Sequence, residues 1–150
     1  MLTSNQGYDA VYSPPRSIRV LCVDDNHDIA DSTATFLRLF GFEAMACYDG
    51  ITALTVAPKY VPNIFFIDLT MPGMEGDELV IRLREECNWQ PKLFVAVTAM
   101  THDAAQERIK KAGFHLHLVK PVDPYTLVGV VNALCRLGSP EATAKEINKD

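Results

Sequence analysis

The chain has 150 residues, 48% of them hydrophobic, which suits one domain with a core of its own. Its formal net charge is −5, and nothing in it resembles the basic stripe that nucleic-acid binding needs. No apolar run approaches the roughly 18 residues of a membrane-spanning helix, and the N-terminus lacks a signal sequence. We therefore expect a cytoplasmic protein with neither a nucleic-acid nor a membrane partner.

The two ends of the chain are polar. Residues 1–17 are rich in turn formers and have no hydrophobic period, so we predict a flexible leader. Residues 138–150 are too few to fold alone, and we predict a frayed polar tail there. The folded domain is then expected over residues 18–137.

Five short apolar runs alternate with five segments of helical periodicity. The runs, each predicted as a buried strand, span residues 18–23, 42–47, 64–67, 93–97 and 116–119. The predicted helices span residues 29–40, 51–59 (ended near Pro58 and Pro62), 77–86, 103–112 and 124–137. This alternation predicts an α/β fold, a doubly wound parallel sheet with helices on both faces, because parallel strands need crossover connections.

Polar residues follow the strands where each apolar run stops. Asp24 and Asp25 end the first strand and Asp68 ends the third. In such folds the carboxyl ends of the strands form the ligand-binding edge, so these carboxylates are expected to lie close together. Crowded carboxylates need a proton or a cation, and all-oxygen ligands without histidine or thiolate favour Mg²⁺.

The same edge receives Thr98 from the fourth strand and Lys120 from the fifth. A carboxylate, a metal ion, a lysine and a hydroxyl that converge on one point meet the needs of phosphoryl transfer. Asp68 can itself be the nucleophile and form an acyl phosphate. No histidine is placed by the sequence as a general base, and an ionised carboxylate needs none.

Four short motifs give a family resemblance over about residues 18–137. In chain order they are Val23-Asp24-Asp25-Asn26, Ile67-Asp68-Leu69-Thr70-Met71-Pro72-Gly73-Met74-Glu75-Gly76, Val97-Thr98-Ala99 and Val119-Lys120-Pro121. Each motif alone is weak, but their order and spacing resemble those of the receiver domain of two-component response regulators, including single-domain chemotaxis regulators. The resemblance implies a flavodoxin-like fold with strand order 2-1-3-4-5.

The resemblance also implies a signalling role for the site. Asp68 would accept phosphate from a phosphohistidine on a sensor histidine kinase or a histidine phosphotransfer protein, and phosphorylation would switch a surface for an unknown protein target. Asp24, Asp25, Asp68 and the Thr70 backbone carbonyl would hold Mg²⁺. Thr98 and Lys120 would bind the phosphoryl oxygens, and Lys120-Pro121 becomes a candidate for a cis peptide bond. No catalysis is implied beyond the domain's own phosphoryl transfer and autodephosphorylation. The domain would be a stand-alone receiver, a relay carrier or a receiver separated from a larger kinase.

One position departs from the family pattern. Three residues before the lysine, where the family usually has Tyr or Phe as a switch residue coupled to Thr98, this chain has His117. His117 can either rotate inward as an aromatic ring would, or simply lie on an exposed face. Together with His115, two residues away on the same face, it could instead seat a transition metal.

Simpler readings compete with this hypothesis. Asp24 and Asp25 could merely cap a helix. The domain could be a pseudo-receiver, an interaction domain that is never phosphorylated. It could also be a Mg²⁺-dependent phosphatase, although such an enzyme is expected to carry an acid two residues after its nucleophile, where this chain has Thr70.

Overall fold

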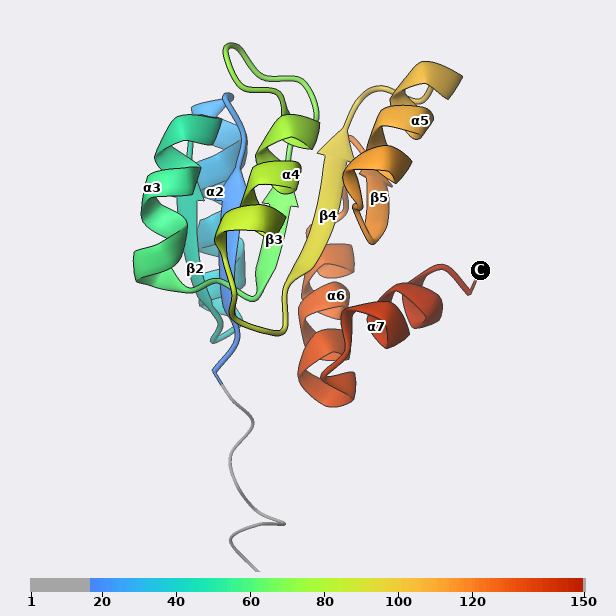
Figure 1. Cartoon of the computed structure of the whole chain (residues 1–150). Coiled ribbons are helices and arrows are strands. Elements are labelled where there is room, and N and C mark those ends of the chain that lie inside the picture. Colours follow the sequence, from blue (N-terminus) through green and yellow to red (C-terminus); the bar gives the residue numbers. More distant parts are fainter. Residues whose placement is uncertain (1–16, 150) are drawn as a thin grey trace, which may run out of the picture.

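A computed structural model describes residues 17–149, so all of the predicted leader except Ser17 lies outside the described residues. Five parallel strands form one sheet with helices on both sides (Figure 1). The strands are β1 Arg19–Val23, β2 Glu43–Cys47, β3 Ile64–Ile67, β4 Leu93–Thr98 and β5 Leu116–Val119. The helices are α2 His27–Leu39, α3 Gly50–Tyr60, α4 Gly76–Glu86, α5 Asp103–Ala112, α6 Pro124–Leu137 and α7 Pro140–Ile147.

The sheet has the order β2-β1-β3-β4-β5, and every neighbouring pair is parallel. The predicted fold class and strand order are therefore confirmed. The order reverses between β1 and β3, which lie side by side at the centre of the sheet. That reversal is the point at which open α/β sheets bind their ligands.

The apolar core is divided by the sheet. One face packs against α2 and α6, with Ala34, Leu37 and Val131 among its fully buried residues. The other face packs against α3 and α4, and a smaller cluster that contains Ala96 and Ile109 joins α5 to the sheet. Because β1, β3 and β4 are covered on both sides, their residues are apolar almost without interruption.

The tail differs from its prediction. Five helices are expected from the sequence, but the described residues form six, because Pro140–Ile147 is helical. Ser139 caps this helix, Thr143 is fully buried, and Glu146 pairs with Arg136 of α6. The polar tail is therefore not frayed up to Ile147, since contact with α6 stabilises a helix that is too short to persist alone.

Helix α3 spans Gly50–Tyr60, within one residue of the predicted 51–59 at each end. It includes Pro58, because a proline in the last turn removes only one of the final hydrogen bonds. No helix among residues 17–149 is long and apolar enough to cross a membrane.

Candidate functional site

The ladder of backbone hydrogen bonds extends one residue past the strands and fixes three of the predicted residues. The amide of Asp24 donates to the Cys47 carbonyl at 3.1 Å, and the amide of Asp68 donates to the Val23 carbonyl at 2.9 Å. In the same way the amide of Lys120 donates to the Thr98 carbonyl at 3.0 Å. The side chains of Asp24, Asp68 and Lys120 are thus positioned by the rigid sheet rather than by loops.

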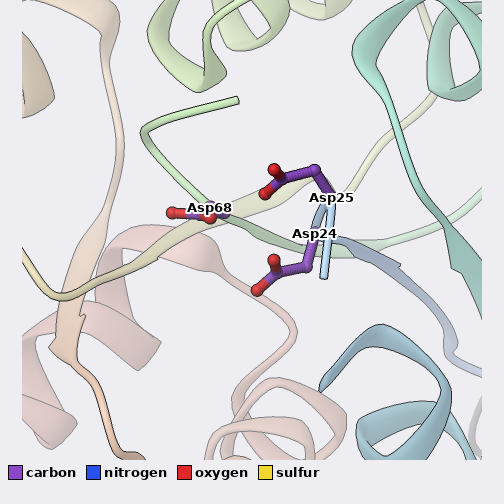
Figure 2. A group of neighbouring side chains, drawn as sticks. All are labelled: Asp24, Asp25 and Asp68. Carbon is purple, nitrogen blue, oxygen red and sulfur yellow. The ribbon is translucent and has the colours of Figure 1, made fainter. Parts of the chain in front are cut away.

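Three carboxylates converge at this edge, as the sequence predicts (Figure 2). One oxygen from each of Asp24, Asp25 and Asp68 lies within 4.8 Å of the other two. Asp24 and Asp68 are only 5% and 8% exposed, whereas Asp25 faces solvent. Among the described residues this is the only such group of three or more His, Cys, Asp or Glu side chains.

Helix capping does not explain the aspartates. The N-cap of α2 is Asn26, whose side chain accepts a hydrogen bond from the amide of Ile29 at 3.2 Å. Asp24 instead accepts from the amide of Asn26 through Oδ1, which leaves its Oδ2 directed to Lys120. Asp25 has no capping role in the described residues.

Lys120 reaches from the end of β5 to the two buried aspartates. Its Nζ lies 2.7 Å from Oδ2 of Asp24 and 3.3 Å from Oδ2 of Asp68. Burial by itself lowers the pKa of Lys120, but the hydrogen bond to Asp24 and the charges of both aspartates outweigh it and raise the pKa above its usual value. The lysine is therefore a fixed positive charge at neutral pH.

Asp68 experiences opposing influences. Burial raises its pKa most; Lys120 lowers it and the nearby Asp24 raises it again, to a pKa of about 6. Asp68 is thus mainly ionised at pH 7, and its charge is less stabilised than that of an exposed carboxylate. An ionised, incompletely paired carboxylate is both a nucleophile and a ligand for a hard cation.

The loop between β3 and α4 folds back tightly onto Asp68. The amide of Thr70 donates to Oδ1 of Asp68 at 3.3 Å, and Gly76 begins α4 directly against the strand end. A Cβ at Gly76 would lie 2.2 Å from the Asp68 carbonyl oxygen. Only glycine permits this approach, so Gly76 serves the position of Asp68.

Thr98 and His117 lie on the side of the site that faces α5. Thr98 is 1% exposed and its hydroxyl accepts from the amide of Met100 at 3.2 Å. His117 pairs with Ala96 in the sheet, and its Nδ1 lies 3.3 Å from the Gln106 amide nitrogen on α5. Its Nε2 is buried without a hydrogen-bond partner among residues 17–149. His117 is thus partly buried against α5.

His115, which directly precedes the strand β5 at Leu116, and His117 within β5 have separate partners. Nδ1 of His115 accepts from the amide of Phe94 at 3.0 Å, and its Nε2 lies 3.6 Å from Glu141 of α7. His115 therefore ties β5 to β4 and α7, while His117 faces Gln106. Among the described residues, no group of three or more His, Cys, Asp or Glu side chains close enough to hold a metal ion includes either histidine.

Two features of the site were not predicted from the sequence. The first is Arg108 of α5, which forms ion pairs with Glu75 and Asp77 beside the Asp68 loop. The second is a groove of about 500 Å³ between α2 and α6, which opens beside Asp68 and Lys120 and is lined by apolar residues such as Ile29 and Phe36. Both join segments far apart in the chain, so no local pattern could reveal them.

The donor atoms fit a hard divalent cation. Three carboxylates lie together at the edge of the sheet without a histidine or cysteine among them. One positive charge from Lys120 cannot balance three negative charges. An all-oxygen site with a remaining negative charge favours Mg²⁺ over zinc. The Thr70 carbonyl remains a predicted ligand only.

A family profile described as "Response regulator receiver domain" matches residues 20–132. The chain is 30% identical over 123 residues to an uncharacterized 14.6 kDa protein of Leptolyngbya boryana, covering 82% of this chain and 94% of that one. It is 35% identical over 128 residues to the transcriptional regulatory protein PrrA of Mycobacterium tuberculosis, covering 85% of this chain but only 54% of PrrA. The chain thus spans about half the length of this mycobacterial relative.

Solved structures agree with the sequence matches. The chemotaxis protein CheY4 of Vibrio cholerae superimposes with a TM-score of 0.71 at 30% identity, covering 77% of this chain and 96% of CheY4. A CheY-like receiver domain protein from Methanospirillum hungatei gives a TM-score of 0.71 at 25% identity, with 80% of this chain and 94% of that one covered.

Proposed function

The chain belongs to the response regulator receiver family, and from this premise we propose that Asp68 is its phosphoacceptor in a Mg²⁺-dependent switch. The observation that carries the proposal is that Asp68, buried and mainly ionised, lies 3.3 Å from the Lys120 ammonium and within 4.8 Å of carboxylate oxygens of Asp24 and Asp25. The sheet holds these groups before any ligand arrives, which is the preorganisation that phosphoryl transfer requires.

The proposed reaction is a transfer without an external base. A carboxylate oxygen of Asp68 attacks phosphorus in line, the P–N bond of a phosphohistidine breaks, and the imidazole leaves with the bonding electron pair and takes a proton from water. Hydrolysis of the acyl phosphate by water later restores Asp68 and releases phosphate. The domain would then be the substrate of a kinase rather than an enzyme that acts on other molecules.

The side chains around Asp68 have separate roles in this proposal. Lys120 would neutralise negative charge on the phosphoryl group, because its Nζ lies 3.3 Å from Oδ2 of Asp68, the side chain that would be phosphorylated. Thr98, buried at the neighbouring strand end, would donate its hydroxyl to a phosphoryl oxygen. When bound by Asp24, Asp25 and Asp68, Mg²⁺ would supply the remaining positive charge facing the same oxygens.

The proposed donor is a sensor histidine kinase or a histidine phosphotransfer protein. A donor imidazole must reach a side chain that is only 8% exposed, so the donor has to dock beside it. The apolar groove between α2 and α6 opens there, and the exposed rings of Phe40 and Tyr125 both pack against Phe36, which lines the groove. An apolar helix on the donor would suit this surface.

The output of the switch would pass through Thr98 and His117. In the described state His117 lies against Gln106, with Nε2 buried and unpaired among residues 17–149. A movement of Thr98 toward a phosphoryl group would change the packing between β5 and α5, and a target protein would read that change.

The pseudo-receiver is the second candidate, and the observation that favours it is His117 at the switch position. The phosphatase alternative has less support, because Thr70 stands where such an enzyme needs an acid and its hydroxyl contacts Met100. The two remaining candidates differ in one property, which is whether Asp68 becomes phosphorylated.

The test is intact mass spectrometry of the protein incubated with acetyl phosphate and Mg²⁺, beside the Asp68→Asn variant. We expect the wild type to gain one phosphoryl group, about 80 Da, as expected for an aspartyl nucleophile. Asp68→Asn should gain none, and chelation of Mg²⁺ should prevent the gain in the wild type. An unphosphorylated wild type that also fails to bind Mg²⁺ would favour the pseudo-receiver, and a gain that persists in Asp68→Asn would disprove the assignment of Asp68.

A further inference from the structure

The loop from Leu69 to Glu75 contains a predicted metal ligand whose orientation depends on the backbone. Its predicted metal ligand is the backbone carbonyl of Thr70, and the orientation of a main-chain carbonyl cannot be adjusted by rotating a side chain. The direction of a backbone carbonyl is set by the φ and ψ angles of the residues on either side of its peptide unit. Whatever holds Leu69 and Met71 therefore also holds the Thr70 carbonyl.

Glu75 and Arg108 hold both of these neighbours. The amide of Met71 donates to Oε1 of Glu75 at 3.1 Å, and Nη2 of Arg108 donates to Oε2 of Glu75 at 2.9 Å. The same Nη2 lies 3.5 Å from the Leu69 carbonyl. One guanidinium group on α5 thus contacts the loop on both sides of Thr70, directly at Leu69 and through Glu75 at Met71.

The position of the guanidinium is itself fixed. Asp77 accepts two parallel hydrogen bonds from Arg108, from Nε to Oδ2 and from Nη2 to Oδ1, each 2.9 Å long. This planar, two-point pairing is specific to arginine, and the side chains of Arg108 and Asp77 are only 30% and 24% exposed. The hydrogen bond from Arg108 lowers the pKa of Asp77, so the pair persists well below neutral pH.

Glu75 gives an independent indication that these contacts serve the loop. It occupies the N-cap position of α4, where a side chain normally accepts a hydrogen bond from the first turn of the helix. The Glu75 carboxylate makes no such bond. It is directed to Met71 and Arg108 instead, so the Glu75 carboxylate stabilises the loop from Leu69 to Glu75 rather than the N-terminus of α4.

We infer that Arg108 is a positioning residue for the cation site: through Glu75 and Asp77 it orients the loop carbonyl of Thr70 toward the cation held by Asp24, Asp25 and Asp68. The inference rests on the proposed function, because it assumes that the three carboxylates bind Mg²⁺. It also gives α5 a second link to the site, beside the contact between Gln106 and His117.

The test is a Mg²⁺ titration without any phosphodonor, followed by the amide NMR signals of the full chain, for wild type and Arg108→Gln. Loss of a group that orients a metal ligand typically weakens metal affinity by 10- to 100-fold, and we expect about tenfold here because the three carboxylates remain. Hydrogen exchange at the Met71 amide should accelerate in Arg108→Gln. Arg108→Lys, which restores the charge but not the two-point pairing, should fall between the two.

Arg82→Gln is the matched control, since it removes an arginine whose ion pair with Glu86 on α4 is exposed. Its Mg²⁺ affinity should equal that of the wild type. A folded Arg108→Gln protein with wild-type Mg²⁺ affinity overturns the positioning role while leaving the proposed function intact. If Arg108→Gln does not fold, Glu75→Gln decides, because it keeps the Asp77 pair, and unchanged Mg²⁺ affinity there overturns the inference. A wild type that binds no Mg²⁺ refutes both proposals.

Discussion

Two lysines at opposite ends of the strands, the half-buried Lys120 and the buried Lys92, have different kinds of partners. Lys120, at the carboxyl edge, contacts the carboxylates of Asp24 and Asp68. Lys92, at the amino edge and only 7% exposed, donates to the backbone carbonyls of Cys87 at 2.7 Å and Trp89 at 3.1 Å. Burial lowers the pKa of Lys92, whereas the aspartates raise that of Lys120 against the same effect of burial.

The different partners of the two lysines distinguish the carboxyl ends of the strands, where the candidate site lies, from the amino ends, where contacts are structural. The Lys92 ammonium donates to two neutral carbonyls, of Cys87 and Trp89, and no carboxylate pairs with it among the described residues, so its contacts serve to close the loop before β4. Lys120 belongs to a cluster in which three carboxylates leave excess negative charge. Lys120, which has charged partners at the ligand-binding end of the sheet, is therefore a functional-site candidate, whereas the contacts of Lys92 are structural.

The largest expected effect comes from exchanging each lysine for methionine. Lys120→Met should slow phosphorylation by acetyl phosphate about 100-fold, which is the usual cost of losing a preorganised charge stabiliser. Lys92→Met should leave that rate unchanged but lower the free energy of unfolding by about 1–3 kcal/mol, because two buried carbonyls lose their donor. The rates come from mass spectrometry and the stabilities from urea denaturation. Equal rates for the two variants would abolish the distinction between the edges.

A second comparison contrasts two glycines. Gly76→Ala should lower the free energy of unfolding by about 3 kcal/mol, because the new Cβ meets the backbone of Asp68, which cannot move aside without disturbing the site. Gly129→Ala on α6, where a Cβ meets nothing within 4 Å, should raise it by about 0.5–1 kcal/mol through helix propensity. Denaturation midpoints measure both, and a stable Gly76→Ala protein would show that the loop can relax.

The stability contributed by His115, at the amino end of β5, should decrease in acid. Burial lowers the pKa of His115 below its ordinary 6.5, so the unfolded chain takes up a proton first as the pH falls. Stability contributed by neutral His115 should therefore be lost as the pH falls below 6.5. The loss should be about 1 kcal/mol, since protonated Nδ1 cannot accept from the Phe94 amide. Thermal denaturation of wild type and His115→Gln between pH 7 and 5 tests this, and parallel curves would contradict it.

The residues at the strand ends could be predicted from the sequence, whereas the contacts between helices could not. Asp24, Asp68 and Lys120 were found because apolar runs stop abruptly at them, and a parallel sheet brings such ends to one edge. The helix α7 was missed, since its stability depends on contact with α6 rather than on its own polar sequence. Arg108 was missed because its partner Asp77 lies 31 residues away and no periodicity links them.

The smallest expected effect concerns Val61, which follows α3 at the amino edge with φ of +53°. In this left-handed conformation a Cβ costs roughly 1–2 kcal/mol, and a β-branched residue is unusual there. Val61→Gly removes the Cβ, while Val61→Ala keeps it and loses only the methyl groups. The glycine variant should therefore be more stable than the alanine variant by about 1 kcal/mol in urea denaturation. Equal stability of the two variants would show that the left-handed conformation does not strain the Cβ of residue 61.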